Sequence, residues 1–315
     1  MTDTTKYKLN HSMIRIKDPK ITVPFYENNF GMKLIHKAEN ADAKFDLYFL
    51  AFDSPSALHS GKARSDREGI LELTHNYGSE DKDGKVYHNG NKEPQGFGHI
   101  CFTVDNISGA CQALESKGVK FQKKQTDGRQ KDIAFALDPD EYWIELVGHG
   151  KDDASAKSDI GSYRFNHTMI RIKDPAVSLK FYTEIMGMEL LRKSEMKDAK
   201  FDLYFLAYPQ AKSEENSTQS GLNPGAAREG ILELTHNYGS EEKEGQVYHN
   251  GNDEPQGFGH IAVSVDNLDA ACERFEQKGV NWKKRLTDGR MKTIAFILDP
   301  DNYWIEIIGN ETLKK

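Results

Sequence analysis

Apolar and polar residues alternate along much of the chain in short runs that are typical of β-strands. Residues 12–17 (SMIRIK) alternate in this way, which predicts a half-buried strand. Asp18 and Pro19 follow as a helix-start signal, and the helix should end near Gly31, because glycine commonly closes the last turn of a helix. The chain is therefore expected to open with a strand followed by a helix.

Mostly apolar runs predict four further strands in the first half of the chain. These runs cover residues 45–52, 70–75, 99–104 and 142–147. A helix is expected over residues 110–117, with Gly118 at its end. Strands mixed with a few short helices favour an α+β fold, in which antiparallel-rich modules curve around a cleft.

The pattern of elements occurs twice because the chain is internally duplicated. NHSMIRIKDP begins at Asn10, and NHTMIRIKDP begins at Asn166. The motifs KFDLYFLA, REGILELTHNYGSE, VYHNGN, EPQGFGHI, TDGR and DPD-x-YWIE also recur in the same order. A repeat of this length is too long for a solenoid and predicts two similar domains. We expect a first domain over residues 1–150, a polar linker over 151–162 and a second domain over 163–315.

Composition narrows the class of protein. The 315 residues are 37% hydrophobic and 29% charged, without an apolar run long enough to cross a bilayer, so no membrane association is expected. The net charge of -7 argues against sequence-independent binding of nucleic acid. Three irregularly spaced cysteines favour neither a disulfide framework nor a thiolate metal site. Because the amino-terminal residues lack a secretory signal, we expect a cytoplasmic protein.

Each of four predicted strands carries one residue that could bind a metal. The eight candidates are His11, Glu72, His99 and Glu145 in the first copy and His167, Glu233, His260 and Glu306 in the second. Each lies in an apolar strand, where a buried charge is costly unless it has a partner. Two imidazoles and two carboxylates suit Zn²⁺, Ni²⁺, Co²⁺ or Mn²⁺. Taken singly, a strand histidine is usually structural and a strand glutamate usually solvated, so the pattern alone leaves a metal site open.

The remaining histidines are expected to have other roles. His75 and His236 have the opposite strand parity to the neighbouring glutamates, which predicts a structural role. His88 and His249 lie in the polar VYHNGN loop and are expected to support a turn. Three others, His36, His59 and His149, occur in one copy only and are assigned no role.

Taken together, the motifs HSMIRIKDP, LELTHN, GFGHI and DPD-x-YWIE closely resemble those of eukaryotic glyoxalase I (lactoylglutathione lyase), in the vicinal oxygen chelate superfamily. The resemblance covers nearly the whole chain, twice, as in the fused two-copy enzymes. It implies an α+β fold of tandem duplicated domains, each of paired βαβββ modules, in a monomer that forms an intramolecular pseudo-dimer. The implied substrate is the methylglyoxal–glutathione hemithioacetal, which is isomerised to S-lactoylglutathione through an enediolate.

The resemblance also implies roles for individual residues. It places His11, Glu72, His260 and Glu306 in one metal site, and His167, Glu233, His99 and Glu145 in the other. Strand periodicity does not distinguish this arrangement from sites within one half. The implied metal is Zn²⁺, with Ni²⁺ as the alternative, and the implied catalytic bases are Glu145 and Glu306. The implied glutathione contacts are Arg15, Asn76, Arg129, Arg171, Asn237 and Arg290. Gln95 and Gln256 depart from the animal enzymes, which have a basic residue there.

Two alternative functions make different demands on the same residues. A ring-cleaving dioxygenase of this superfamily would bind Fe²⁺ with two histidines and one glutamate and leave a position open for O₂. The fourth candidate ligand in each set favours glyoxalase I instead. A non-catalytic binding module of the antibiotic-resistance type would need no metal ligands, and the eight retained candidates argue against it.

Overall fold

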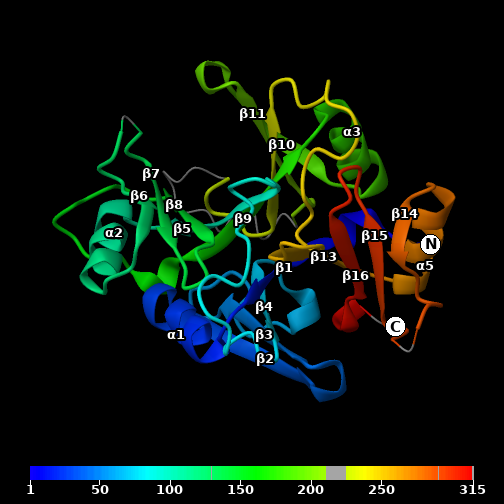
Figure 1. Cartoon of the computed structure of the whole chain (residues 1–315), viewed down its shortest axis with the longest axis horizontal. Coiled ribbons are helices and arrows are strands. Elements are labelled where there is room, and N and C mark those ends of the chain that lie inside the picture. Colours follow the sequence, from blue (N-terminus) through cyan, green and yellow to red (C-terminus); the bar gives the residue numbers. More distant parts are fainter. Residues whose placement is uncertain (129, 211–224, 290, 314–315) are drawn as a thin grey trace.

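Two eight-stranded sheets dominate the computed structural model, which describes residues 1–128, 130–210, 225–289 and 291–313 (Figure 1). The first sheet contains, in spatial order, β14 (Asn281–Lys284), β15 (Ile294–Leu298), β16 (Trp304–Gly309), β13 (Phe258–Val265), β1 (Lys8–Ile16), β4 (Ile70–Asn76), β3 (Phe45–Phe52) and β2 (Met32–Asn40). The second contains β10 (Glu189–Met196), β11 (Phe201–Ala207), β12 (Ile231–Asn237), β9 (Arg164–Ile172), β5 (Phe97–Val104), β8 (Trp143–Gly148), β7 (Ile133–Leu137) and β6 (Phe121–Lys123). The predicted α+β class and duplicated βαβββ modules are confirmed.

Each sheet combines one module from each half of the chain. In the first sheet, β1 pairs antiparallel with β13, and the parallel neighbours β4 and β16 flank this central pair. In the second sheet, β5 and β9 form the equivalent antiparallel pair, flanked by β8 and β12. Side chains from both copies therefore share one face of each sheet.

The helices follow local capping signals. Within the described ranges they are α1 (Pro19–Phe30), α2 (Ile107–Ser116), α3 (Pro175–Lys180) and α5 (Leu268–Gln277). The prediction for α1 is confirmed: the Asp18 side chain accepts a hydrogen bond from the Lys20 amide, and Gly31 ends the helix at a φ of 74°. The predicted start of α2 was too late, because the side chain of Asn106 caps the helix by accepting a hydrogen bond from the Gly109 amide.

The first strand is buried on both faces, so the expectation of half-burial was wrong. Ile14 and Ile16 are fully buried in the core, and on the opposite face His11 and Met13 are only 3% and 7% exposed. The face that carries His11 can be buried because neighbouring strands supply charged partners for it: His11 contacts Glu72 of β4 and Glu306 of β16. On the core side, Ser12 Oγ lies 2.7 Å from Thr168 Oγ1, which links the central strands of the two sheets.

Aromatic packing joins the modules. Phe102 on β5 contacts Phe30 on α1 and Phe165 on β9, with ring centroids 5.0 and 5.4 Å apart. Phe97 and Phe258, from different sheets, stack with centroids 4.8 Å apart and planes inclined by 11°. Because buried aromatic pairs add stabilisation beyond the area that they bury, these contacts stabilise the packing of the modules, and the Phe97–Phe258 pair stabilises the contact between the two sheets.

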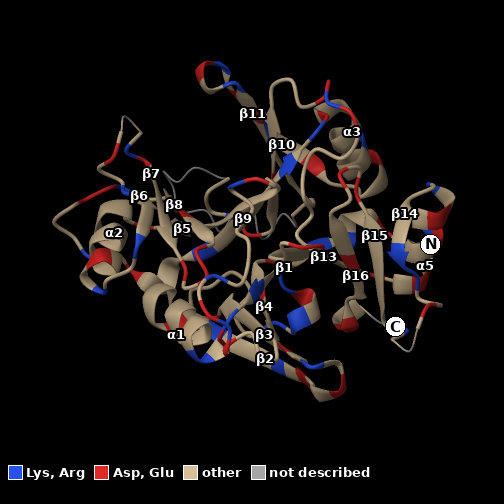
Figure 2. Ribbon diagram, viewed as in Figure 1, with Lys and Arg blue, Asp and Glu red and all other residues tan. Residues whose placement is uncertain are grey.

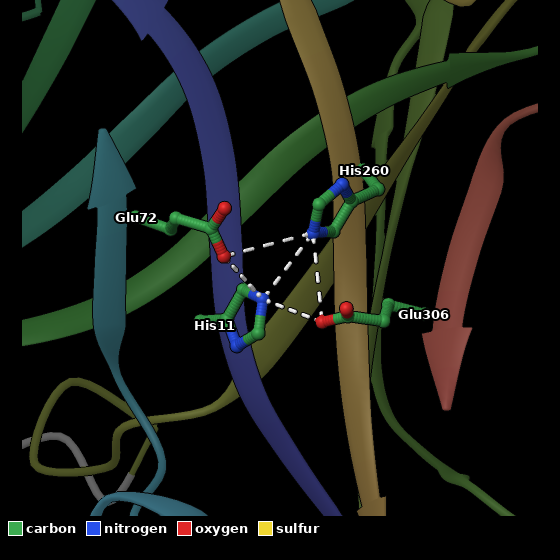
Figure 3. A group of neighbouring side chains, drawn as sticks. All are labelled: His11, Glu72, His260 and Glu306. Carbon is green, nitrogen blue, oxygen red and sulfur yellow. Dashed lines mark hydrogen bonds and ion pairs between the residues drawn. The ribbon is translucent and has the colours of Figure 1, made fainter. Parts of the chain in front are cut away.

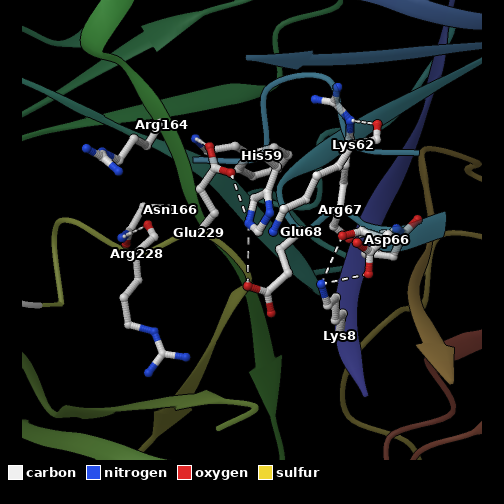
Figure 4. Close-up of polar contacts among 12 residues, drawn as sticks. Lys8, His59, Lys62, Asp66, Arg67, Glu68, Arg164, Asn166, Arg228 and Glu229 are labelled. Carbon is white, nitrogen blue, oxygen red and sulfur yellow. Dashed lines mark hydrogen bonds and ion pairs between the residues drawn. The ribbon is translucent and has the colours of Figure 1, made fainter. Parts of the chain in front are cut away.

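A buried polar cluster lies where the two REG motifs meet (Figure 4). His59 Nε2 is 3.8 Å from a carboxylate oxygen of Glu68 and 3.7 Å from one of Glu229. Burial lowers the pKa of His59 to about 3 and raises the pKa of Glu229 to about 8. A Cβ atom on Gly230, whose φ is +69°, would lie 2.8 Å from the Glu68 carboxyl group. Glycine at this position therefore lets the two halves approach closely.

Charged residues are distributed over most elements, with basic and acidic side chains interspersed (Figure 2). Within the described ranges, no helix has the length and apolar character needed to span a bilayer. All three cysteines are free, and Cys101 and Cys111 are buried.

Candidate metal centres and active sites

The eight candidate ligands form two compact groups, and both halves of the chain contribute to each. One group contains His11, Glu72, His260 and Glu306, from β1, β4, β13 and β16 (Figure 3). The other contains His99, Glu145, His167 and Glu233, from β5, β8, β9 and β12. Within each group, the possible ligand atoms all lie within 4.8 Å of one another. The geometry thus resolves what strand periodicity left open: the groups straddle the halves.

Distances in the first group suit one metal ion. His11 Nε2 lies 2.9 Å from Glu72 Oε2 and 3.0 Å from Glu306 Oε2. The Nε2 atoms of His11 and His260 are 3.3 Å apart. With metal–ligand bonds of about 2.0–2.2 Å, adjacent ligand atoms should be about 3 to 3.5 Å apart. Two imidazoles and two carboxylates at these separations can therefore surround a divalent cation.

The second group repeats this geometry. His167 Nε2 lies 2.8 Å from Glu233 Oε2 and 3.1 Å from Glu145 Oε2. The Nε2 atoms of His99 and His167 are again 3.3 Å apart. The duplication has therefore produced two groups with the same donor set and matching spacing.

Asn10 fixes which nitrogen of His11 faces the group. Its Nδ2 donates to the carbonyl oxygens of Arg64 and Arg67, both at 2.8 Å, so its Oδ1 must face the imidazole. His11 Nδ1 donates to that oxygen at 2.8 Å, which leaves Nε2 as the nitrogen that faces the two carboxylates. Asn166 makes the same contact with His167 Nδ1 at 2.7 Å. An imidazole nitrogen that faces two carboxylates shares either a proton or a metal ion with them, so this arrangement fits a metal.

Electrostatics lead to the same conclusion. Burial lowers the pKa of His11, but hydrogen bonds to Glu306 and Glu72 outweigh it and raise the pKa to about 9. The pKa of His260 is lowered instead, by burial and by the positive charge on His11. Burial raises the pKa of Glu306, but its contacts with His11 and His260 lower it overall. Only one of the two histidines therefore holds a proton, because two adjacent imidazolium ions would repel each other. The two carboxylates of the group could balance the charge of a divalent cation in place of that proton.

The predicted glutathione contacts hold the structure together around the sites. Arg15 Nη1 donates to the carbonyl oxygens of Gly251 and Phe258, at 3.1 and 3.2 Å, in the other half of the chain. Asn76 Nδ2 donates to the Tyr87 hydroxyl at 3.0 Å. Arg171 and Asn237 make the equivalent contacts in the second copy. Their role in binding glutathione stays a prediction, and Arg129 and Arg290 lie outside the described residues.

A cavity of about 1000 Å³ borders the first group. Glu72 and Glu306 contribute to its wall, together with His36, Phe49 and Arg64. The volume is at the upper end of the range for small-molecule pockets and can accommodate a peptide-sized adduct. The sequence analysis did not predict that His36, Phe49 and Arg64 line this cavity. The alternation of residues along β3 places Phe49 on the same face as Leu47 and could have indicated the position of Phe49.

Other histidines lie outside both groups, as predicted. His75 Nε2 is paired with Glu80 at 2.7 Å. His88 Nε2 lies 3.0 and 3.1 Å from the carbonyl oxygens of Lys92 and Pro94, within a turn. Both contacts support local structure.

Comparisons with known proteins agree with this geometry. Residues 8–146 and 164–307 each match the model of the Glyoxalase/Bleomycin resistance protein/Dioxygenase superfamily. The chain is 57% identical over 309 residues to lactoylglutathione lyase of Schizosaccharomyces pombe, and 46% identical over 328 residues to glyoxalase I of Saccharomyces cerevisiae. Each alignment covers 98% of both chains.

A solved structure supports the fold over the same length. The crystal structure of glyoxalase I from Zea mays superposes with a TM-score of 0.71 at 25% identity, and covers 96% of this chain and 92% of that one. With two family matches, two full-length relatives and two His/Glu groups, the chain belongs to the Glyoxalase/Bleomycin resistance protein/Dioxygenase superfamily, as a two-copy enzyme of its glyoxalase I (lactoylglutathione lyase) branch.

Proposed function

We propose that the chain isomerises the hemithioacetal of methylglyoxal and glutathione to S-lactoylglutathione at two sites. The observation that carries this proposal is the pair of buried groups, each with two imidazoles and two carboxylates from both halves. A divalent metal ion held there would act as a Lewis acid for negative charge on the two substrate oxygens. The names of the full-length relatives support the same reaction.

Proton transfer is the task of the glutamates. Glu306 in one site and Glu145 in the other would remove the proton from the carbon that bears sulfur and hydroxyl, and return it to the neighbouring carbonyl carbon. The reaction gains and loses no atoms. Figure 3 shows Glu72 and Glu306 reaching His11 from opposite sides. This placement would let Glu72 serve the opposite stereoisomer of the substrate.

Three finer features belong to the same proposal. Zn²⁺ is the proposed metal and Ni²⁺ the alternative, since both accept mixed nitrogen and oxygen ligands. One chain would form both sites, so we propose a monomer with an internal pseudo-dimer. The proposed location is the cytoplasm, where glutathione is abundant.

Thioester formation gives a direct test. Absorbance at the thioester band should rise when the protein meets pre-equilibrated methylglyoxal and glutathione, and chelation should abolish this rise. Glu145→Gln with Glu306→Gln should lower kcat by roughly 10²- to 10⁴-fold, the usual contribution of a general base. Glu276→Gln is the matched control, because this exposed glutamate on α5 lies outside both groups.

The opposite outcome would contradict the proposal. If the metal-replete protein forms no thioester, the two groups serve another reaction. Oxygen uptake with catechols would then identify the ring-cleaving alternative. Metal content by mass spectrometry and molar mass by light scattering would test the proposed Zn²⁺ and the proposed monomer independently.

A further inference from the structure

Each site has a guanidinium stacked on the phenylalanine beside its first histidine. Phe49 packs edge-on against His11 with ring centroids 5.7 Å apart, and the guanidinium carbon of Arg64 lies 4.4 Å from the centroid of the Phe49 ring. In the other site, Phe205 packs against His167 at 5.7 Å, and the guanidinium carbon of Arg192 lies 4.3 Å from the Phe205 centroid. Both sites therefore present one cation at the same place.

The two arginines come from different positions in the repeat. Arg192 is the cross-strand partner of Phe205, and the residue in the corresponding place opposite Phe49 is His36. Arg64 begins a short 3-10 helix, Arg64–Asp66, before β4, and Asn10 Nδ2 donates to its carbonyl oxygen. Asn166 Nδ2 donates to Gly225 at the equivalent point, so the second copy has glycine there. Each copy thus lacks the arginine of the other and supplies its own.

The stacking leaves the donors of each guanidinium available. Among the residues that the structure describes, the Arg64 and Arg192 side chains form no hydrogen bond or ion pair with a protein acceptor. A cation–π contact does not use the N–H groups as hydrogen-bond donors to a protein acceptor, so each guanidinium can still bind a carboxylate through two parallel hydrogen bonds. Arg64 also lines the cavity beside Glu72 and Glu306, so its donors can reach a ligand held there.

We propose that Arg64 in one site and Arg192 in the other bind a carboxylate of the glutathione part of the substrate. This inference rests on the proposed function and names a specificity-determining residue for it. The stacked phenylalanine limits the orientation of the cation, and the metal-binding histidine supports that phenylalanine. Arg64 lies in a 3-10 helix before β4, and Arg192 lies on the edge strand β10, so the two sites would bind the same group with arginines from different elements.

Single-site proteins make the proposal testable. Glu145→Gln leaves the site of Arg64 active, and Glu306→Gln leaves the site of Arg192 active. Arg64→Met in the first protein, and Arg192→Met in the second, should each raise KM by roughly 10- to 100-fold, the range of a hydrogen bond to a charged group. The value of kcat should change much less, because the contact is the same in the ground and transition states.

A matched control and a rescue distinguish binding from structure. Lys37→Met removes a cation that lies over the ring of Tyr48, the neighbouring aromatic residue of the same hairpin, and should leave KM unchanged. His36→Arg combined with Arg64→Met places the cation where the second copy carries it, and should restore a low KM. A purely structural role for Arg64 would give no such rescue.

Blocked substrates identify the carboxylate. Adducts of glutathione amidated at the glycine or at the γ-glutamyl carboxylate should bind more weakly, and one of these losses should vanish in Arg64→Met. Additive losses for both amides would overturn the proposal, as would an unchanged KM in both arginine variants. Failure of the proposed function would look different, because the single-site proteins would then form no thioester even with both arginines present.

Discussion

Replacing Asn10 tests whether a residue outside the metal group controls it. Asn10 is fully buried, accepts a hydrogen bond from His11 Nδ1 and donates two to the carbonyl oxygens of Arg64 and Arg67, all at 2.8 Å. Asn10→Leu removes all three contacts. Partners that orient a metal-binding histidine typically contribute 10- to 100-fold in metal affinity, about 1.4 to 2.7 kcal/mol. We expect a loss of this size at the first site.

Stability should fall as well, by a separate route. The two carbonyl oxygens lose their donors, which costs about 1–3 kcal/mol for each one left without a partner. Asn10→Asp separates the two effects, because a carboxylate still accepts from His11 Nδ1 but cannot donate to the carbonyl oxygens. This variant should lose stability and keep most of its metal affinity.

The assay needs a protein with one metal site. Glu145→Gln with Glu233→Gln would weaken the second group, so that competition with a chromophoric Zn²⁺ chelator reports the first. Nitrogen-15 spectra of the imidazoles would show directly whether Nδ1 of His11 carries the proton. The reasoning is refuted if Asn10→Leu binds Zn²⁺ as tightly as the parent protein and the imidazole spectrum is unchanged.

Three further predictions follow from the fold and the buried groups. The pKa of Glu229, about 8, exceeds its ordinary value of 4.5, so the folded state retains the proton and the free energy of unfolding should fall as pH rises between these values. Glu229→Gln should flatten this decline in denaturant titrations at several pH values, and an unchanged slope would contradict the assignment. Phe97→Ala should destabilise the protein by about 3–5 kcal/mol, because Phe97 stacks on Phe258 between the sheets, whereas Phe121→Ala at a half-buried edge strand should cost less. Chelation should lower Tm, since a ligand at 100 times its Kd stabilises by about 2.7 kcal/mol, and an unchanged Tm would argue against bound metal.

Sequence reasoning located the candidate ligands because two independent signals agreed on them. Strand parity placed Glu72 on one face of an apolar strand, and the duplication repeated it as Glu233. Parity says which face a side chain occupies but does not say which strand lies next to it, so the pairing of His11 with Glu306 required either family resemblance or the structure. For the same reason, strand parity did not show that each sheet combines one module from each half of the chain.

Other features were missed for identifiable reasons. β2 is an edge strand with mostly exposed side chains, so its apolar signal is weak. Asn10 is repeated as Asn166, and this repeat could have indicated its role, but its neighbour His11 attracted the chemical argument. Arg64 and Arg192 escaped comparison of the copies because they occupy different positions in the repeat.

Because each sheet combines one module from each half of the chain, the two groups of ligands are completed at different times during synthesis. All four ligands of the second group lie between His99 and Glu233, so that sheet can close before the final strands leave the ribosome. The first group begins at His11 but must wait for His260 and Glu306, near the carboxyl end. A nascent chain would therefore leave the edge of β1 that faces β13 unpaired until residues 258–265 have been made, and loss of β13 and β16 would remove one site while leaving every ligand of the other in place.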